Sequence, residues 1–195
     1  FQAFLEEIKD GAEFLARIRS HSEKSGAAMR AGCIGLYPSL DEVLKRAEVQ
    51  AKLTHDTVAG IGAAQAAALM THYLAYRLGP RAALGAFIEE HVEGEWARPW
   101  SGKIGPLGSM STRAAITVVS QHASLSQVLM ACVAFEGDVD TAAAIAMGPA
   151  SCAPDKIADL DDRLFDDLER GPFGYEYLRN LDESLAHKFP VLAKS

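Results

Sequence analysis

The sequence predicts a globular, all-α fold, and three observations lead to that prediction. Apolar residues recur at steps of three and four along most of the 195 residues, which is the periodicity of a helix face. Alternating strand patterns are nearly absent, and the one ambiguous run, residues 114–119, has neighbours that favour helix. Hydrophobic residues make up 49% of the chain, as in globular proteins. We therefore expect a single all-helical domain over residues 1–195.

The first half of the chain contains three predicted helical regions. Apolar residues at helical spacing predict helix over residues 1–19. A capping box at residues 39–42, in which Glu42 follows Ser39 by three positions, opens a helix that runs through Leu53. Residues 57–78 are rich in alanine and mostly uncharged, so we expect a central buried helix there. Gly60 and Gly62 cost that helix roughly 1 kcal/mol each, which indicates close approach of a neighbouring helix or a ligand.

The second half alternates helices with turns. Gly79 and Pro80 end the central helix, and residues 93–109 form a loop rich in glycine, proline and tryptophan. Helices are expected at residues 81–92, 112–122, 125–135, from residue 141 onward, and at 175–187. The acidic run within residues 155–169 is expected to be the solvated face of a helix.

Charge and cysteine content exclude several classes of function. With 19 Lys and Arg against 26 Asp and Glu, the formal net charge is −7, which argues against nucleic-acid and membrane-surface binding. No apolar run approaches the about 18 residues of a bilayer span, and no signal peptide is evident, so we expect a cytoplasmic protein. Cys33, Cys132 and Cys152 lack metal-ligand spacing and are expected to be reduced, buried thiols.

The most unusual cluster lies at residues 137–141, where Asp138, Asp140 and Thr141 interrupt an apolar pattern. Residues two apart on a helix point about 200° apart, so the two carboxylates can converge only if a helix begins here and Gly137 permits the turn. Carboxylate and hydroxyl oxygens suit Mg²⁺ or another hard cation. The alternative is that Asp138 or Asp140 simply caps the helix that starts at Thr141.

Two further segments offer polar chemistry. Residues 25–30, Ser-Gly-Ala-Ala-Met-Arg, combine a small-residue loop with an arginine, which lets backbone N–H groups approach a phosphate; the same residues also permit tight packing. His55 lies between two predicted helices, where it either caps the carbonyl groups of the preceding helix or donates to a bound anion or hydroxyl. The other five histidines are expected to lie at the surface or to be satisfied in the core: His21, His72, His91, His122 and His187.

Taken in order, these segments resemble the ADP-ribosylglycohydrolase family. Residues 25–30 look like its Asn-Gly-Ala-Ala-Met-Arg substrate loop, residues 53–55 like its Leu-Thr-His segment, and residues 137–141 like its Gly-Asp-Thr-Asp-Thr metal motif. Residues 168–182 are similar to the C-terminal end of many bacterial members. The resemblance implies an orthogonal helical bundle around two Mg²⁺ ions, with Mn²⁺ as an alternative metal.

The same resemblance implies roles for individual residues. Asp138, Asp140 and Thr141 would hold one side of the metal pair, and His55 would lie against the ADP-ribose. The loop at residues 102–111 would also face the substrate. The diphosphate would rest on the backbone of Ser25, Gly26, Ala27, Ala28 and Met29.

The sequence also departs from the family pattern. The other metal-binding half, a Thr-Asp-Asp run, and the early acidic residue expected to act as general base do not occur here, so the sequence identifies no catalytic residue. Ser25 replaces Asn, and Val139 replaces Thr. Because the chain opens at Phe1, we expect that an N-terminal portion with its helices is missing, and that the apolar face left uncovered forms a homodimer.

The expected function is Mg²⁺-dependent cleavage of the glycosidic bond between ADP-ribose and a protein side chain or small molecule. An ADP-ribosylated protein or an ADP-ribose-like small molecule would be the partner. The alternative is a catalytically inactive family member or fragment that binds ADP-ribose or serves as a structural or interaction module.

Overall fold

The structure, a computed structural model, describes residues 2–166 and 168–192. Across this part of the chain the regular elements are all helical, with isolated backbone bridges and no strand, which confirms the all-α prediction. The elements are α1 (Gln2–Glu7), α2 (Gly11–Arg17), α3 (Gly26–Ala31), η1 (Gly32–Leu36), α4 (Leu40–Lys52), α5 (Val58–Ala75), η2 (Arg81–Ala83), α6 (Leu84–Glu89), α7 (Gly108–Gln121), α8 (Leu125–Ala134), α9 (Val139–Cys152), α10 (Arg163–Asp166) and α11 (Tyr175–Lys188). That residues 1–195 form one domain stays a prediction.

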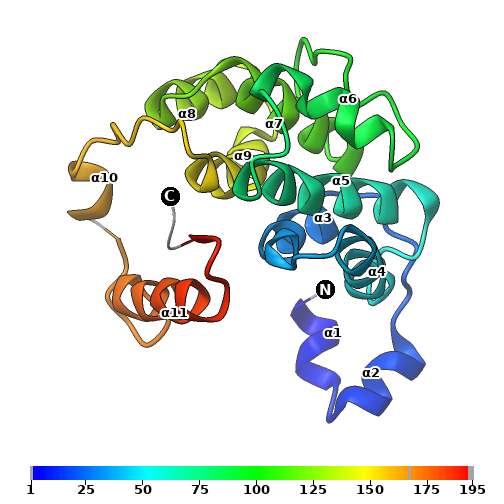
Figure 1. The fold of residues 1–195 in the computed structure, drawn as a ribbon. Coiled ribbons are helices and arrows are strands. Elements are labelled where there is room, and N and C mark those ends of the chain that lie inside the picture. The colour runs from blue at the N-terminus through cyan, green and yellow to red at the C-terminus, as the bar shows by residue number, and fades with distance from the viewer. Residues whose placement is uncertain (1, 167, 193–195) are drawn as a thin grey trace.

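Helix α5 is the centre of the bundle, as its alanine-rich sequence predicts. Thr57 caps its N-terminus by accepting a hydrogen bond from the Gly60 N–H at 3.0 Å. Most of its residues are buried, with α3, η1 and α4 against one side and α7 and α9 against another (Figure 1). Small side chains allow the neighbouring backbones to approach closely, so every functional segment described below is positioned against this helix or one of its neighbours.

The capping box of α4 is only half formed. Ser39 Oγ accepts a hydrogen bond from the Glu42 N–H at 3.4 Å. The Glu42 carboxylate turns along the helix and pairs with Arg46 at 2.7 Å, so it does not return to the backbone of Ser39. The predicted start of the helix is therefore correct, although the side chain of Glu42 has a different partner.

The prediction of a continuous helix over residues 1–19 is wrong for the described residues. The chain breaks between α1 and α2, where Asp10 is extended and accepts a hydrogen bond from the Glu13 N–H at 2.8 Å. The Glu13 carboxylate in turn accepts from the Lys9 N–H at 3.0 Å. This local capping arrangement begins a second helix, and neither α1 nor α2 buries a residue.

The acidic segment is mostly irregular rather than one side of a helix, which corrects the prediction. Its helix, α10, has four residues. Asp159 instead reaches the N-terminus of α8, where it accepts hydrogen bonds from Ser124 Oγ at 2.6 Å and from the Ser126 N–H at 3.0 Å. A carboxylate at a helix N-terminus also interacts favourably with the helix dipole. One residue of the expected solvated face thus anchors the chain beyond α9 to the bundle.

This anchor predicts a pH dependence of stability. The hydrogen bond from Ser124, followed by those from Ser126, lowers the pKa of Asp159 from 3.8 to about 2. A carboxyl group with a lowered folded-state pKa stabilises the fold above 3.8, and this contribution disappears as the pH falls toward 2. Asp159→Asn should therefore reduce the loss of thermal stability over this range, measured by circular dichroism. Asp162→Asn alters an exposed carboxylate of the same segment, and this variant should lose as much thermal stability over this pH range as the parent does.

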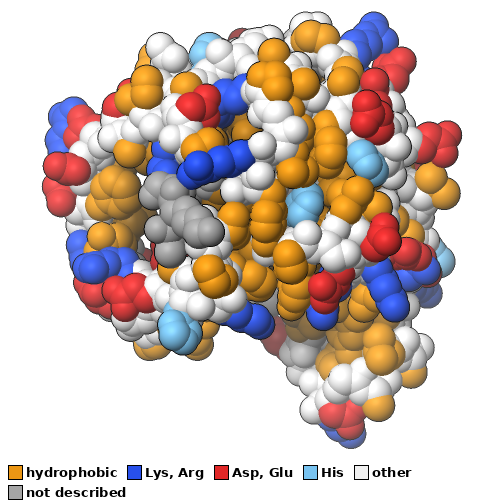
Figure 2. Space-filling model, in the orientation of Figure 1, with side chains coloured by type: hydrophobic (Ala, Val, Ile, Leu, Met, Phe, Trp, Pro, Cys, Tyr) orange, Lys and Arg blue, Asp and Glu red, His pale blue; other side chains and the backbone are white. Residues whose placement is uncertain are grey.

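Helix α11 stands apart from the other helices (Figure 1), and none of its residues is buried. Phe189, which directly follows α11, contacts the bundle. Its ring packs edge to face on the ring of Tyr37, with the ring centres 5.3 Å apart. Figure 2 shows hydrophobic side chains gathered along the middle of this face of the molecule. Such exposed apolar surface is consistent with the predicted homodimer, which stays a prediction.

Several smaller predictions are also settled. Residues 114–119 are helical within α7. The His72 ring is buried, and its Nδ1 lies 3.1 Å from the carbonyl oxygens of Gly35 and Tyr37, as expected of a satisfied core histidine. Cys132 is buried, which raises its pKa to about 11. Cys33 is exposed and Cys152 is only partly buried, so the prediction of three buried thiols is wrong for Cys33 and holds only in part for Cys152. In the described part of the chain, no helix combines the length and apolarity that a bilayer crossing requires.

Candidate functional site

The predicted metal motif lies at a sharp reversal between α8 and α9. Two consecutive residues adopt left-handed backbone conformations, Glu136 with φ 63° and Gly137 with φ 82°. A non-glycine residue in this region is uncommon, and such strain gathers at functional sites. Helix α9 begins directly afterwards at Val139, with Asp138 at the N-cap position and Asp140 in the first turn. The condition under which the two carboxylates can converge is therefore met.

The helix-cap alternative is correct for the position of Asp138, which is the N-cap residue of α9, but not for a capping hydrogen bond. Helix α9 begins at Val139, two residues before the expected start, and the side chain of Asp138 makes no capping hydrogen bond. Asp140 is exposed and Thr141 is buried. Within residues 2–166 and 168–192 neither carboxylate makes a side-chain hydrogen bond or ion pair, so both remain available to a ligand.

A loop between α6 and α7 is hydrogen-bonded to this reversal. The Ile104 N–H donates to the Glu136 carbonyl at 3.0 Å, and the Asp138 N–H donates to the Ile104 carbonyl at 3.1 Å. Ile104 is buried, and a Cβ atom on Gly137 would overlap its carbonyl oxygen. The backbone of the metal motif is therefore held in place by a segment more than 30 residues earlier in the chain.

The other end of the same loop is hydrogen-bonded next to the predicted substrate segment. The Gly108 N–H donates to the Glu23 carbonyl at 2.8 Å, and Lys24 pairs with Leu107 in an antiparallel bridge. The four residues from Ile104 to Leu107 are separated by three steps along the chain, which span at most about 11 Å. The loop thus brings together two segments that are far apart in the sequence, and it lies within the predicted substrate-facing range 102–111.

The predicted substrate segment forms the short helix α3 and its N-cap, Ser25. Ser25, Ala27 and Ala28 are buried, whereas Met29 is 46% exposed. The buried residues have small side chains, so this segment can offer a ligand mainly the backbone N–H groups of its first turn, which lack helical acceptors. The Ser25 side chain makes no capping hydrogen bond.

His55 lies directly beside this segment. A Cβ atom on Gly26 would lie 3.3 Å from His55 Cε1, and His55 is 6% exposed. Gly60 permits this position, because a Cβ atom there would lie 2.7 Å from the His55 carbonyl oxygen. The close approach at Gly60 comes from His55 and the Ser22 carbonyl, which lie outside the helices, rather than from a neighbouring helix. At Gly62 the nearest atom would be 3.7 Å away, which is ordinary contact.

The surroundings of His55 favour a neutral ring with a defined tautomer. Burial, followed by the charge of Arg30, lowers the pKa of His55. The Arg30 guanidinium donates to Thr54 Oγ1 at 2.8 Å, and Thr54 Oγ1 lies 2.6 Å from His55 Nδ1. Since arginine can only donate, the Thr54 hydroxyl accepts from it and can donate to Nδ1. When the hydroxyl donates to Nδ1, the ring proton lies on Nε2, which then acts as a donor.

The capping alternative for His55 holds for its backbone and not for its ring. The His55 N–H donates to the Ala51 carbonyl in the last turn of α4 at 2.7 Å, whereas the ring bonds to Thr54. The supporting residues, Gln50 and Thr54, were missed by the sequence analysis. Gln50 accepts from Arg30 at 2.9 Å and donates to the Ala27 carbonyl at 3.1 Å, so it ties α4 to α3. A polar residue in the last turn of an amphipathic helix gives no signal of such a role.

The donor set fits one side of a magnesium site. Asp138, Asp140 and Thr141 present hard oxygen atoms, and Mg²⁺ is commonly held by one or two carboxylates together with water. Among the described residues, however, no group of three or more His, Cys, Asp or Glu side chains could hold a metal ion. This part of the chain therefore does not assemble the two-ion site that the family resemblance implies.

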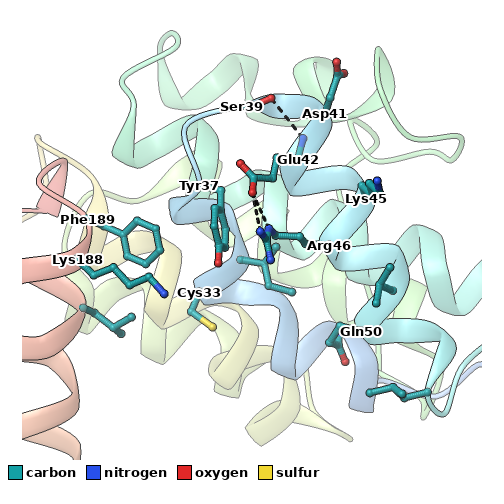
Figure 3. Close-up of a pocket in the computed structure, with 14 residues that line it drawn as sticks. Cys33, Tyr37, Ser39, Asp41, Glu42, Lys45, Arg46, Gln50, Lys188 and Phe189 are labelled. Carbon is teal, nitrogen blue, oxygen red and sulfur yellow. Dashed lines mark hydrogen bonds and ion pairs between the residues drawn. The ribbon is translucent and has the colours of Figure 1, made fainter.

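A large hollow in the described surface lies elsewhere. About 920 Å³ in volume, it lies between α4 and the end of α11, and Figure 3 shows the Arg46 side chain over the Tyr37 ring beside Phe189. The distance from the guanidinium carbon to the ring centre is 4.1 Å. None of the predicted site residues lines this hollow. Its size alone therefore gives no reason to place the reaction there.

Comparison with known proteins gives an independent result. The family model described as ADP-ribosylglycohydrolase matches residues 1–191, nearly the whole chain. No curated protein matches the chain.

Proposed function

Since the chain belongs to the ADP-ribosylglycohydrolase family, we propose that it binds ADP-ribose and takes part in Mg²⁺-dependent hydrolysis of an ADP-ribosyl glycosidic bond. The observation that carries the proposal is the loop from Ile104 to Gly108. It links the backbone of Asp138 to that of Lys24, beside Ser25. A single ligand can therefore contact the metal motif and the substrate segment together.

Each segment contributes a different interaction in this proposal. The first-turn N–H groups of α3 hydrogen-bond the diphosphate. The His55 Nε2–H donates to an oxygen of the ligand. Asp138, Asp140 and Thr141 hold the metal, which when bound orients a water molecule and polarises the substrate. Thr141 is buried in α9, and this burial holds its hydroxyl group in position.

A binding experiment tests the proposal. ADP-ribose is titrated calorimetrically into the protein with and without Mg²⁺, and we expect Mg²⁺ to strengthen binding. Changes to residues that only orient metal ligands cost about 10–100-fold, so Asp140→Asn should cost at least about tenfold in the presence of Mg²⁺. Asp41→Asn is the matched control, because Asp41 is an exposed carboxylate in the first turn of α4. An equal loss of ADP-ribose affinity in the two variants would contradict a role for Asp140 in metal binding.

A second candidate function is ADP-ribose binding without hydrolysis. It is favoured by one observation, that the described residues do not bring three acidic or other metal-binding side chains together. Incubation with ADP-ribosylated peptides and Mg²⁺ separates the two functions. Release of ADP-ribose supports hydrolysis, binding without release supports the second candidate, and failure to bind ADP-ribose overturns both.

A further inference from the structure

A second cavity adjoins the candidate ADP-ribose site and lies between α3, η1, α5, α9 and α11. Its volume is about 740 Å³, within the usual range for small-molecule sites. Most of its lining is apolar, including Leu36 of η1, Ile145 of α9 and Leu178 of α11. It also touches Ala28 and Met29 of the substrate segment.

One polar group in the wall of this cavity has no partner. Thr71 of α5 is 3% exposed, and its Oγ1 makes no hydrogen bond. A buried hydroxyl without a partner is unfavourable, and such groups in native structures call for an explanation. A threonine in a helix often bonds to a carbonyl of the preceding turn, but Thr71 does not.

The residue facing Thr71 leaves room for a ligand. Gly32 also lines the cavity, and a Cβ atom on it would lie 4.0 Å from Thr71 Oγ1. A side chain at position 32 would therefore stand against this hydroxyl, whose oxygen is almost fully enclosed in the described structure. On the far side the wall is α11, which buries none of its own residues and gives the least tightly packed wall.

Charged groups at the cavity do not favour an ionic ligand. The Arg30 guanidinium is already bonded to Gln50 and Thr54. The other charged side chain in the lining is Asp182, whose exposed carboxylate can remain in water. A neutral molecule with an apolar body and one hydrogen-bonding group matches this lining best.

We propose that this cavity binds a small, neutral, mainly apolar molecule whose hydroxyl group hydrogen-bonds to Thr71 Oγ1. The bound molecule contacts Ala28 and Met29, which belong to the segment whose N–H groups are proposed to bind the diphosphate. The site is independent of the proposed hydrolysis, and its test needs neither Mg²⁺ nor ADP-ribose.

Benzyl alcohol and toluene are suitable probes, because they differ only by a hydroxyl group on the methyl carbon. The titrations are followed by NMR of the methionine methyl groups. Met29 lines the cavity, and Met130 of α8, 71% exposed, does not and is the internal control. We expect benzyl alcohol to shift the Met29 signal saturably, to leave that of Met130 unchanged, and to bind more tightly than toluene.

Three variants make the test specific. Thr71→Val keeps the shape and removes the hydroxyl, so it should weaken benzyl alcohol binding roughly fivefold and leave toluene binding unchanged. Thr71→Ser keeps the hydroxyl group and should still bind benzyl alcohol more tightly than toluene. Gly148→Leu should block both probes, because Gly148 lines the cavity and a Cβ atom there meets nothing within 4 Å. No saturable shift of Met29, or an unchanged preference in Thr71→Val, overturns the proposal.

Discussion

Gly35→Ala is expected to lower the free energy of unfolding by at least about 3 kcal/mol. Gly35 is buried in η1 against α5, and a Cβ atom on it would overlap the Ala68 carbonyl oxygen. The same atom would lie 2.7 Å from the His72 nitrogen and from Thr71 Cβ. Backbone atoms of the central helix cannot move aside as the end of a flexible side chain can. For a chain of this length the melting temperature should fall by about 6–12 °C, as measured by circular dichroism.

Gly148→Ala is the matched control for this prediction. Gly148 lies inside α9, and a Cβ atom there would meet nothing within 4 Å. Replacing an open helical glycine by alanine should stabilise the protein by up to about 1 kcal/mol. A melting temperature of Gly35→Ala equal to that of the parent would show that η1 and α5 are not as close as described.

Gly137→Ala should weaken ADP-ribose binding in the presence of Mg²⁺ by at least about tenfold, or about 1.4 kcal/mol. The left-handed backbone at φ 82° costs alanine about 1–2 kcal/mol. The new Cβ would also overlap the Ile104 carbonyl and lie 2.8 Å from Lys103 Cγ. Both hydrogen bonds of Ile104 to the metal motif would be disrupted, so the loop would no longer hold Asp138 in place. Calorimetric titration measures the effect.

Gly102→Ala is the matched control, because it introduces the same backbone strain without a steric overlap of the new Cβ atom. Gly102 belongs to the same loop and also has a left-handed backbone, with φ 88°, but a Cβ atom there would meet nothing within 4 Å. Its effect on ADP-ribose binding should be much smaller. If the two variants lose the same affinity, the pairing between the loop and the metal motif does not matter for binding.

Much of the fold could be predicted because its signals are local. Ser39 and Thr57 are each followed by helical periodicity, and both cap helices through contacts only three residues away. The break before α2 had a similar local signal in Asp10 and Glu13, but the apolar spacing continues across it and suggested a single helix.

The contacts that assemble the candidate site could not be predicted in the same way. The pairing of Ile104 with Gly137 and of Lys24 with Leu107 involves backbone groups, which every residue has, so side-chain identity carries no signal of it. Asp159 likewise bonds to Ser124, 35 residues earlier, from within a run of similar carboxylates. The residue types of the site were evident from the sequence, but their proximity follows from tertiary structure.

Because α11 buries none of its residues, it can open locally at a lower free energy than the central helices can. The amides of α5 are enclosed by helices from both halves of the chain, so they exchange with solvent only when most of the fold opens. The amides of α11 depend on hydrogen bonds within an exposed helix, and a helix of 14 residues is marginal by itself in water. Helix α11 therefore unfolds and refolds many times during the lifetime of the central helices, and each opening exposes the cavity beside Thr71 to solvent.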